Sequence, residues 1–413
     1  MNPHFVRPDW VRRLNQFGPA TGGAPHLIPL DAAELLAIAR SSTGLSEIGD
    51  DAWIETYMRR VRSIDEDSNA NLLGRLLCRA ETLRVLQTQL RLHAAWTKTP
   101  EILDQPIERP IFVVGPPRTG TTILLELLAL DPNLRAPIAW EAHHPLPHEG
   151  APDTARAIAL GESEQEFWAD IQPELMALHE LRSDLPCECI HFMALEFGSG
   201  YWDMHYPTPS FGEWAGTQPD IVPRIYRGHR RFLQTLQHGR GARRWLLKSP
   251  VHMVMLEALL AEYPDALLVQ THRDPMKFVG STASTTAMIG WLRSDTVDRH
   301  AQGQIALLGF SAILDFVREL RSSGAVREDQ FVDSHYVDLI ANPVAAIRKI
   351  YDRAGLAWPD GHDETIERYL RDKPKGKFGK HEYRLEDYGL SEQLVEDAYS
   401  NYTAHYGVER ESA

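Results

Sequence analysis

The first quarter of the chain carries apolar residues at helical spacing. Between Asp31 and Thr97 they recur every three or four positions, in the groups Leu35-Leu36-Ile38, Leu72-Leu73-Leu76-Leu77 and Leu83-Val85-Leu86-Leu90-Leu92. Asp31 and Asp50 are expected to cap helix N-termini, and Pro100 to end the last helix. The ~25 residues before this region are rich in Pro, Gly and Arg and predict an irregular arm. We expect a helical N-terminal extension over residues 1–105.

The pattern changes at Pro110, where short continuous apolar runs begin to alternate with helices. Ile111–Val114 is followed by the glycine-rich segment Gly115–Thr122 and a leucine-rich helix. Two further apolar runs end in polar residues in the same way: Arg244–Leu247 before Lys248, and Ala266–Val269 before Arg273. This alternation predicts a parallel sheet covered on both faces, with ligands at the carboxyl ends of its strands. The predicted fold class is therefore α/β, a three-layer α/β/α domain of the P-loop type over residues 106–413.

A helix-rich insertion with many aromatic residues is expected at about residues 145–240. These aromatic side chains are Trp168, Tyr201, Trp202, Tyr206, Phe211, Trp214 and Tyr226. We expect most of them to belong to the core and two or three to reach a ligand pocket, because such pockets are mostly apolar.

Charge and hydropathy narrow the classes of partner. The chain of 413 residues has 43 Lys and Arg against 57 Asp and Glu, a formal net charge of -14, which disfavours nucleic acid or an anionic membrane as the main partner. It has no run of about eighteen apolar residues and no secretory signal pattern near its start. We therefore predict a cytoplasmic protein without stable membrane insertion.

Three cysteines, Cys78, Cys187 and Cys189, are too few for a disulfide framework. The spacing of Cys187 and Cys189 is tighter than that of the usual paired zinc ligands, and no HExxH motif accompanies them. The sequence therefore predicts buried thiols and no metal site.

Gly115–Thr122 has the spacing G-x-x-x-x-G-x-[ST] of a nucleotide-binding loop, with Thr121 where the lysine of nucleoside triphosphatases stands. Backbone N–H groups at a helix N-terminus bind one phosphate without that lysine, and Arg118 could bridge the phosphate and a neighbouring anionic oxygen. The loop therefore favours a donor whose transferred group is less charged than a γ-phosphoryl group, and sulfuryl transfer fits. A purely structural strand-to-helix turn is the alternative.

With this loop and the later Arg273 and Ser281, the sequence resembles the sulfotransferases that use 3′-phosphoadenosine 5′-phosphosulfate (PAPS), within them a bacterial-type group with a helical N-terminal preface. The resemblance implies that the loop holds the 5′-phosphate and the bridging oxygen of PAPS, and that Arg273 and Ser281 bind its 3′-phosphate. The loop residues concerned are Pro117, Arg118, Thr119, Gly120, Thr121 and Thr122. The segment Lys375–Tyr383, with Lys380 and His381, resembles the segment that closes over the 3′-phosphate and adenine; a solvated basic loop is the alternative reading.

Transfer to a hydroxyl needs a general base and a cation near the transferring group. The resemblance implies Lys248 for the cation, Arg118 beside the reacting group, and Glu141 for the base. Other branches of the family use a histidine shortly after the lysine; here the nearest is His252, four positions on. His179 and Glu180 resemble a stretch that borders the acceptor. The choice among Glu141, His252 and His179 stays open.

The sequence therefore predicts an enzyme that moves a sulfuryl group from PAPS to a hydroxyl of a small, apolar or aromatic acceptor. The products are a sulfate ester and adenosine 3′,5′-bisphosphate, and no metal is required. A P-loop small-molecule kinase and a non-catalytic nucleotide-binding regulator are the alternatives. The helical extension offers a packing surface for a possible homo-oligomer.

Overall fold

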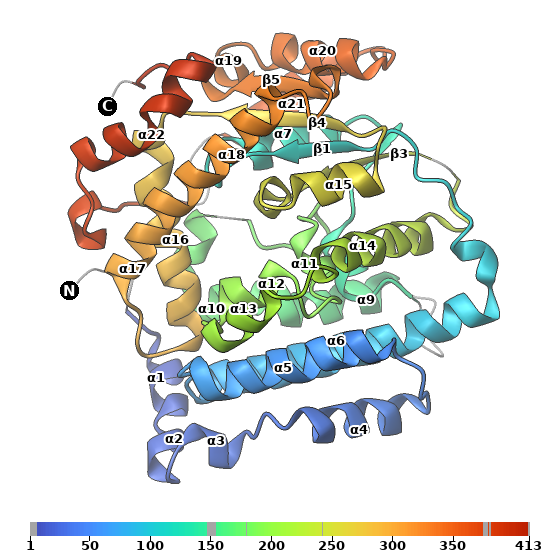
Figure 1. Ribbon diagram of the computed structural model, residues 1–413, viewed down its shortest axis with the longest axis vertical. Helices are drawn as coiled ribbons and strands as arrows, with labels where there is room; N and C mark the ends of the chain where they lie inside the picture. Colours follow the sequence, from blue (N-terminus) through green and yellow to red (C-terminus); the bar gives the residue numbers. More distant parts are fainter. Residues whose placement is uncertain are drawn as a thin grey trace.

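The centre of the molecule is a sheet of five parallel strands in the order β2-β3-β1-β4-β5 (Figure 1). The computed structural model describes residues 6–146, 154–178, 180–241, 243–374, 379 and 381–411. The strands are β1 (Ile111–Val114), β2 (Leu134–Arg135), β3 (Arg244–Lys248), β4 (Leu267–His272) and β5 (Phe331–His335). All three predicted apolar runs are strands, which confirms the parallel sheet.

Side chains alternate along the strands between two cores. Ile111 and Val113 of β1 pack against one helical layer, and Phe112 and Val114 pack against the other. The first layer contains α7 (Thr121–Leu128), α19 (Tyr336–Ala341), α20 (Pro343–Ala354) and α21 (His362–Asp372). The second contains α14 (Ile221–Gln237), α15 (Leu256–Glu262), α16 (Pro275–Arg293), α18 (Phe310–Ser322) and α22 (Glu392–Tyr406). The predicted three-layer α/β/α fold is thus confirmed.

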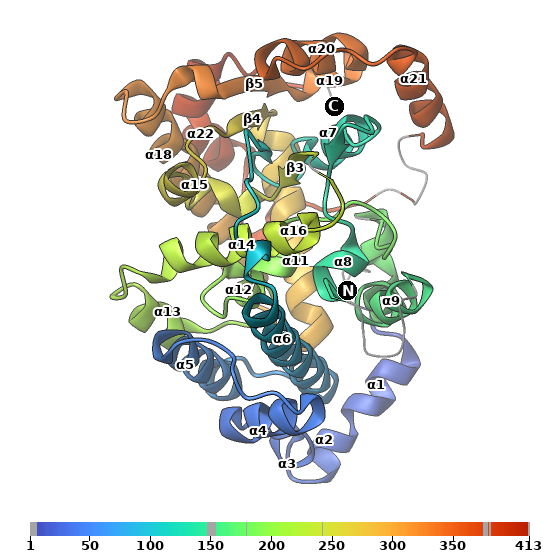
Figure 2. The ribbon, with the colours of Figure 1, turned by 90° about the vertical axis from the view of Figure 1, so that its right-hand side faces the viewer.

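The N-terminal helices lie at the end of the molecule away from the sheet (Figures 1 and 2). They are α4 (Ala32–Thr43), α5 (Asp51–Asp67) and α6 (Leu72–Lys98). The Asp31 carboxylate accepts a hydrogen bond from the Glu34 amide and the Asp50 carboxylate one from the Trp53 amide, both at 2.8 Å, so the predicted caps are confirmed. The helical extension is present, and its boundary at residue 105 stays a prediction.

The prediction of an irregular arm is wrong for residues 9–27. These residues form the short helices α1 (Asp9–Asn15), α2 (Phe17–Ala20) and α3 (Ala24–Leu27). Val11 is fully buried, and the Asn15 side chain accepts a hydrogen bond from the Leu73 amide at 3.1 Å. Contacts with α6, which the local composition does not encode, therefore stabilise α1.

The predicted insertion between β2 and β3 is mostly helical where the structure describes it, with an irregular stretch over residues 180–189. Its helices before α14 are α8 (Ala139–His143), α9 (Thr154–Gly161), the π-helical turn Glu162–Glu166, α10 (Phe167–Ile171), α11 (Ile190–Met193), α12 (Gly200–His205) and α13 (Pro209–Ala215). Of the seven aromatic residues noted above, all but the half-buried Trp214 are buried, which confirms that most are core.

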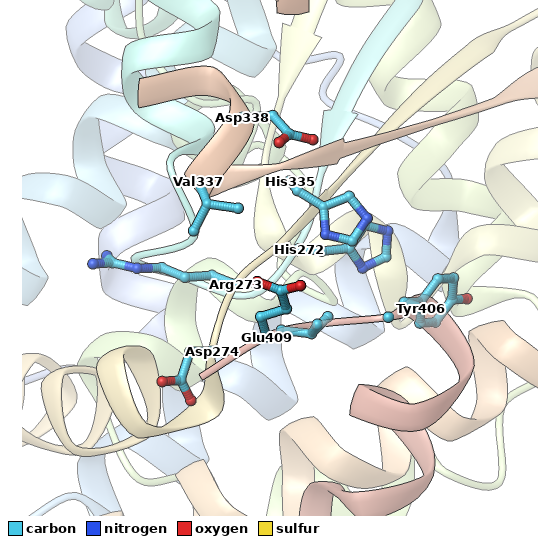
Figure 3. A pocket seen from close by; sticks show the side chains of 10 residues that line it. His272, Arg273, Asp274, His335, Val337, Asp338, Tyr406 and Glu409 are labelled. Atoms are coloured by element: carbon cyan, nitrogen blue, oxygen red, sulfur yellow. The ribbon is translucent and has the colours of Figure 1, made fainter. Parts of the chain in front are cut away.

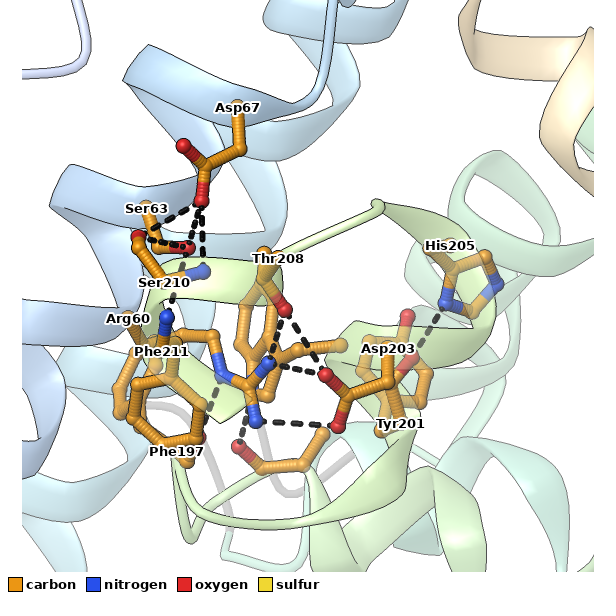
Figure 4. A network of polar contacts seen from close by, with 12 residues as sticks. Arg60, Ser63, Asp67, Phe197, Tyr201, Asp203, His205, Thr208, Ser210 and Phe211 are labelled. Carbon is orange, nitrogen blue, oxygen red and sulfur yellow. Dashed lines mark hydrogen bonds and ion pairs between the residues drawn. The ribbon is translucent and has the colours of Figure 1, made fainter. Parts of the chain in front are cut away.

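A buried arginine joins the extension to the insertion (Figure 4). Arg60 on α5 donates to the Phe197 carbonyl at 2.9 Å, to Asp203 Oδ2 at 3.0 Å and to Thr208 Oγ1 at 2.6 Å. Such a charge is stable in the interior only when its donors are paired, so this network fixes α5 against α12.

Among the described residues, no helix combines the length and the apolar character required to cross a bilayer.

We expect Gly74→Ala to destabilise the protein, because α6 and α16 approach each other at this glycine. A Cβ at Gly74 would lie 2.0 Å from the Arg293 carbonyl oxygen, and backbone cannot move aside as a flexible side chain can. Such overpacking costs about 1–3 kcal/mol in the free energy of unfolding, measured by urea denaturation. The matched control is Gly212→Ala on α13, where a Cβ meets no atom within 4 Å. Equal stability of both variants would contradict the packing.

Candidate active site

The loop after β1 reverses direction at two glycines that no other residue could replace without strain. Gly115 has φ +150° and Gly120 has φ +93°. A Cβ at Gly115 would lie 2.0 Å from Thr271 Oγ1 on β4, and one at Gly120 would lie 2.8 Å from Tyr336 Cδ2. The backbone therefore passes directly over the neighbouring strand and the start of α19.

Threonines fix the loop in this position. Thr119 Oγ1 donates to the Pro116 carbonyl at 2.7 Å and lies 2.6 Å from Thr271 Oγ1. Thr121 is buried at the first position of α7, while Pro117 and Thr122 are half-buried. The first amides of α7 cannot bond within the helix, so together with the helix dipole they form a site for an anion.

Two arginines meet at this loop. Arg118 has φ +69° and donates from Nη1 to the Leu178 carbonyl at 2.8 Å. Arg273, just after β4, donates from Nη1 to the Arg118 carbonyl at 2.8 Å. Burial, and then the charge of Arg273, lower the pKa of the Arg118 guanidinium. The positive charge gathered here suits a ligand with more than one anionic group.

The Arg273 guanidinium also binds a carboxylate. Its Nε and Nη2 atoms donate to the two oxygens of Glu411, at 2.8 and 3.1 Å, and its Cζ atom lies 3.9 Å from the centre of the Tyr336 ring. Figure 3 shows the guanidinium extending away from His272 and His335, which line the adjacent pocket. Glu411 thus occupies two donors of the arginine that the resemblance assigns to the 3′-phosphate.

Residues 381–385 cross α16 beside these arginines. A Cβ at Gly280, next to the buried Ser281, would lie 2.6 Å from Tyr383 Cε2, and the Tyr383 hydroxyl donates to the Lys277 carbonyl at 3.3 Å. Burial raises the pKa of Tyr383, and the charges of Arg273 and Arg118 oppose that shift. The His381 ring centroid lies 5.7 Å from that of Tyr383. Lys380 and residues 375–378 lie outside the described residues.

Lys248 lies at the carboxyl end of β3 and faces the loop. Its side chain is buried, Nζ donates to Thr122 Oγ1 at 3.3 Å, and it forms an ion pair with Glu188. The Glu188 side chain is 19 % exposed, so it lies at the edge of the interior. The amide of the next residue, Cys189, donates to the Lys248 carbonyl at 2.8 Å, which holds this part of the insertion against β3.

Glu141, the first candidate for the base, lies in a buried ion-pair cluster. Its carboxylate accepts from Arg135 Nη2 at 3.0 Å and from the Ile138 amide at 3.3 Å, and it also contacts Arg240. Arg135 in turn donates to the Leu236 carbonyl at 2.7 Å and lies over the Trp245 ring. These contacts join α8 to the region around β3 and are typical of a structural ion pair.

His252 is fully buried behind β1, where its ring packs edge-on against Phe112 with centroids 5.0 Å apart. Burial lowers its pKa to about 3, and Nδ1 lies 2.9 Å from the Tyr226 hydroxyl. An acceptor that enters from solvent would not reach this ring. His179 lies outside the described residues, and Glu180 pairs with Lys373 at 2.7 Å.

Comparison with known proteins identifies the family. Residues 110–360 match the model of the sulfotransferase family. The chain belongs to this family. It is 25 % identical, over 321 residues, to the omega-hydroxy-beta-dihydromenaquinone-9 sulfotransferases Stf3 of Mycobacterium bovis and Mycobacterium tuberculosis, with 73 % of this chain and 76 % of each relative covered.

Two solved mycobacterial structures share the sulfotransferase fold over nearly their whole length. Sulfotransferase STF9 of Mycobacterium avium superposes with a TM-score of 0.77 at 28 % identity, covering 92 % of this chain and 98 % of that one. Sulfotransferase STF1 of Mycobacterium tuberculosis gives 0.73 at 29 % identity, covering 90 % and 99 %. The family and the P-loop-type fold implied by the sequence resemblance are thus confirmed.

The sulfotransferase brings most of the predicted site residues together around one loop. Lys248 bonds to Thr122 and Arg273 bonds to the Arg118 carbonyl, whereas Glu141 and His252 have hydrogen-bond partners outside this loop. Glu188, the partner of Lys248, could not be singled out from the sequence, because no local pattern marks it. The position of Glu188 follows from the hydrogen bond between the Cys189 amide and the Lys248 carbonyl on β3. This contact joins residues that are far apart in the sequence, so it is seen only in the folded structure.

We expect Glu141→Gln to lower the free energy of unfolding of this sulfotransferase by about 3 kcal/mol, because Arg135 would stay buried without a carboxylate partner. The Arg135 side chain is 6 % exposed, so solvent cannot replace the lost contact. The matched control is Glu55→Gln, whose pair with Arg59 is about half exposed on both sides and should change stability by at most about 0.5 kcal/mol. Urea unfolding of the variants tests this; equal effects would contradict the assignment.

Proposed function

We propose that this sulfotransferase uses PAPS as its donor and transfers the sulfuryl group to a hydroxyl of a small apolar acceptor. The observation that carries the proposal is the hydrogen bond from Arg273 to the Arg118 carbonyl, which makes the loop and the second arginine parts of one anion site. The loop would hold the 5′-phosphosulfate, and Arg273 with Ser281 the 3′-phosphate. Residues 381–385 would cover the nucleotide from the side of α16.

The two alternative functions, a P-loop small-molecule kinase and a non-catalytic nucleotide-binding regulator, are less well supported than sulfuryl transfer. A kinase of this class needs an ammonium group for the γ-phosphate, and Thr121 places a buried hydroxyl at that position of the loop. A regulator without activity would have no use for Lys248 and Glu188 beside the transferring group. The alignment of a cation and a carboxylate with the loop therefore favours transfer chemistry.

In the proposed reaction the acceptor oxygen attacks the sulfur atom of PAPS. A new S–O bond forms, and the bond between sulfur and the bridging oxygen of the 5′-phosphate breaks with its electron pair on that oxygen. Glu188 takes the hydroxyl proton, since its carboxylate is partly exposed and lies beside Lys248 at the loop. Lys248 stabilises the charge that develops on the leaving oxygen.

The acceptor is proposed to have an apolar body and one reacting hydroxyl. The mycobacterial relatives are named for a hydroxylated menaquinone, which has this chemistry. In this chain the insertion supplies Glu188, and its aromatic residues form the core that holds this segment in place. The acceptor would therefore approach between the insertion and the loop.

Adenosine 3′,5′-bisphosphate should raise the melting temperature more than ATP with Mg²⁺, because only the former carries the 3′-phosphate expected at Arg273. At a concentration 100 times Kd the gain is about 2.7 kcal/mol, read by thermal shift. Arg273→Met should abolish the stabilisation by the bisphosphate. Glu411→Gln should increase that stabilisation, because it removes the negative charge that competes for Arg273. The control is Arg348→Met, whose side chain is 46 % exposed on α20. Tighter binding of ATP would overturn the proposal.

Glu188→Gln should reduce turnover by about 10²–10⁴-fold while leaving bisphosphate binding intact, as expected for loss of a general base. Lys248→Ala should also reduce turnover, because the leaving oxygen loses its nearby cation. The measurement is release of adenosine 3′,5′-bisphosphate from PAPS, with an alcohol or phenol that the native enzyme accepts. Glu141→Gln, assayed below its melting temperature, provides the comparison. A large loss there with full activity in Glu188→Gln would return the base to Glu141.

A further inference from the structure

Three metal-binding side chains converge behind the sheet, on the side of α14. Cys189 directly precedes α11, His229 lies on α14, and His252 lies on the single helical turn Pro250–Met253. One ligand atom from each lies within 4.8 Å of the other two. All three residues are buried, and the thiol of Cys189 is not part of a disulfide.

The hydrogen bonds of the two histidines leave one nitrogen of each without a partner. His229 Nδ1 lies 2.7 Å from the Tyr263 hydroxyl, and His252 Nδ1 lies 2.9 Å from the Tyr226 hydroxyl. Within the described part of the chain, Nε2 of each ring is buried and has no hydrogen-bond partner. An unsatisfied buried polar atom costs about 1–3 kcal/mol, so two in one cluster call for an explanation.

We propose that Cys189, His229 and His252 bind one metal ion of the class that prefers thiolate and imidazole ligands. The Nε2 atoms would be the ligands, and the tyrosine hydroxyls would orient the rings through Nδ1, as outer partners do in known metal sites. Metal–nitrogen and metal–sulfur bonds of about 2.0–2.3 Å require donors roughly 3.5 Å apart. The ligand atoms lie within 4.8 Å of one another, so a contraction of about 1.3 Å or less would reach that geometry.

The charge of the site favours Cu(I) over Zn²⁺. One thiolate and two neutral imidazoles make a neutral complex with a monovalent ion, but they leave one positive charge with a divalent ion. The rings of Phe112 and Phe192 pack on His252 and His229, with centroids 5.0 and 4.9 Å apart, so the surroundings are apolar. An uncompensated charge is costly there, and soft ligands already select Cu(I).

A metal ion at this site would affect the proposed active site by holding the segment that carries Glu188 in place. The Cys189 amide donates to the Lys248 carbonyl, and Glu188 precedes Cys189 in the chain. An ion held by α14 and the turn after β3 would brace the segment that places Glu188 beside Lys248. Sulfuryl transfer itself involves no metal in this arrangement, so binding can be tested without an activity assay.

The experiment uses the full chain under anaerobic, reducing conditions. Cu(I) is supplied as its acetonitrile complex in competition with bathocuproine disulfonate, and Zn²⁺ is titrated separately against a chromophoric chelator. We expect one Cu(I) per chain, bound more tightly than Zn²⁺. X-ray absorption at the copper edge should show one sulfur and two nitrogen ligands. This spectrum reports on the native protein and does not depend on a variant that folds.

Cys189→Ser should weaken Cu(I) binding by at least about 100-fold, because loss of a ligand should exceed the roughly 10–100-fold loss seen when an outer partner of a ligand is removed. Cys187→Ser is the matched control, because Cys187 is also buried and lies two residues away, outside the cluster. Circular dichroism of both metal-free variants establishes that they fold. Failure of the native chain to bind either ion, a spectrum without sulfur, or Cu(I) binding that Cys187→Ser abolishes and Cys189→Ser does not would each overturn the proposal.

Discussion

The candidate active site depends on the contact between the loop after β1 and the neighbouring strand β4. Gly115 passes so close to Thr271 that a single added methyl group would meet the threonine oxygen. This approach brings the loop carbonyls within reach of Arg273, the residue that follows β4. Two segments separated by about 150 residues thereby meet at the proposed anion site, and adjacent parallel strands fix its geometry.

The parts of the fold that local sequence determines could be predicted. Both faces of β1, β3 and β4 are covered, so each of these strands is a short apolar run. Parallel strands end on the same side of a sheet, so Lys248 and Arg273 lie together at its carboxyl end. β5 was not recognised as a strand, since Asp333, Ser334 and His335 interrupt its apolar pattern. β2 has only two residues, too few for any pattern to emerge.

The side chains supplied by the insertion could not be predicted, because their positions depend on packing between distant segments. Glu141 was a reasonable candidate by its place after α7, yet Arg135 and Arg240 hold its carboxylate. Glu188 has no distinctive neighbours in the sequence except two cysteines, and a backbone hydrogen bond to β3 gives it its position. The same contact brings Cys189 toward His229 and His252, which spacing along the chain could not reveal.

Lys248 and Arg273, which stand at the ends of β3 and β4, are each paired with a carboxylate. The two pairs differ in what the binding of a donor would require. Glu411 holds the Arg273 guanidinium in the bidentate manner of a phosphate, so a phosphate with more charge and more acceptor oxygens can take its place. In the proposed reaction Glu188 keeps its place, because its carboxylate is the group that would take the hydroxyl proton. The hydrogen bond from the Cys189 amide to the Lys248 carbonyl holds the segment that carries Glu188 beside this lysine. In the proposed mechanism, the pair of Arg273 and Glu411 would thus reserve a binding site for the nucleotide, and the pair of Lys248 and Glu188 would keep base and cation together.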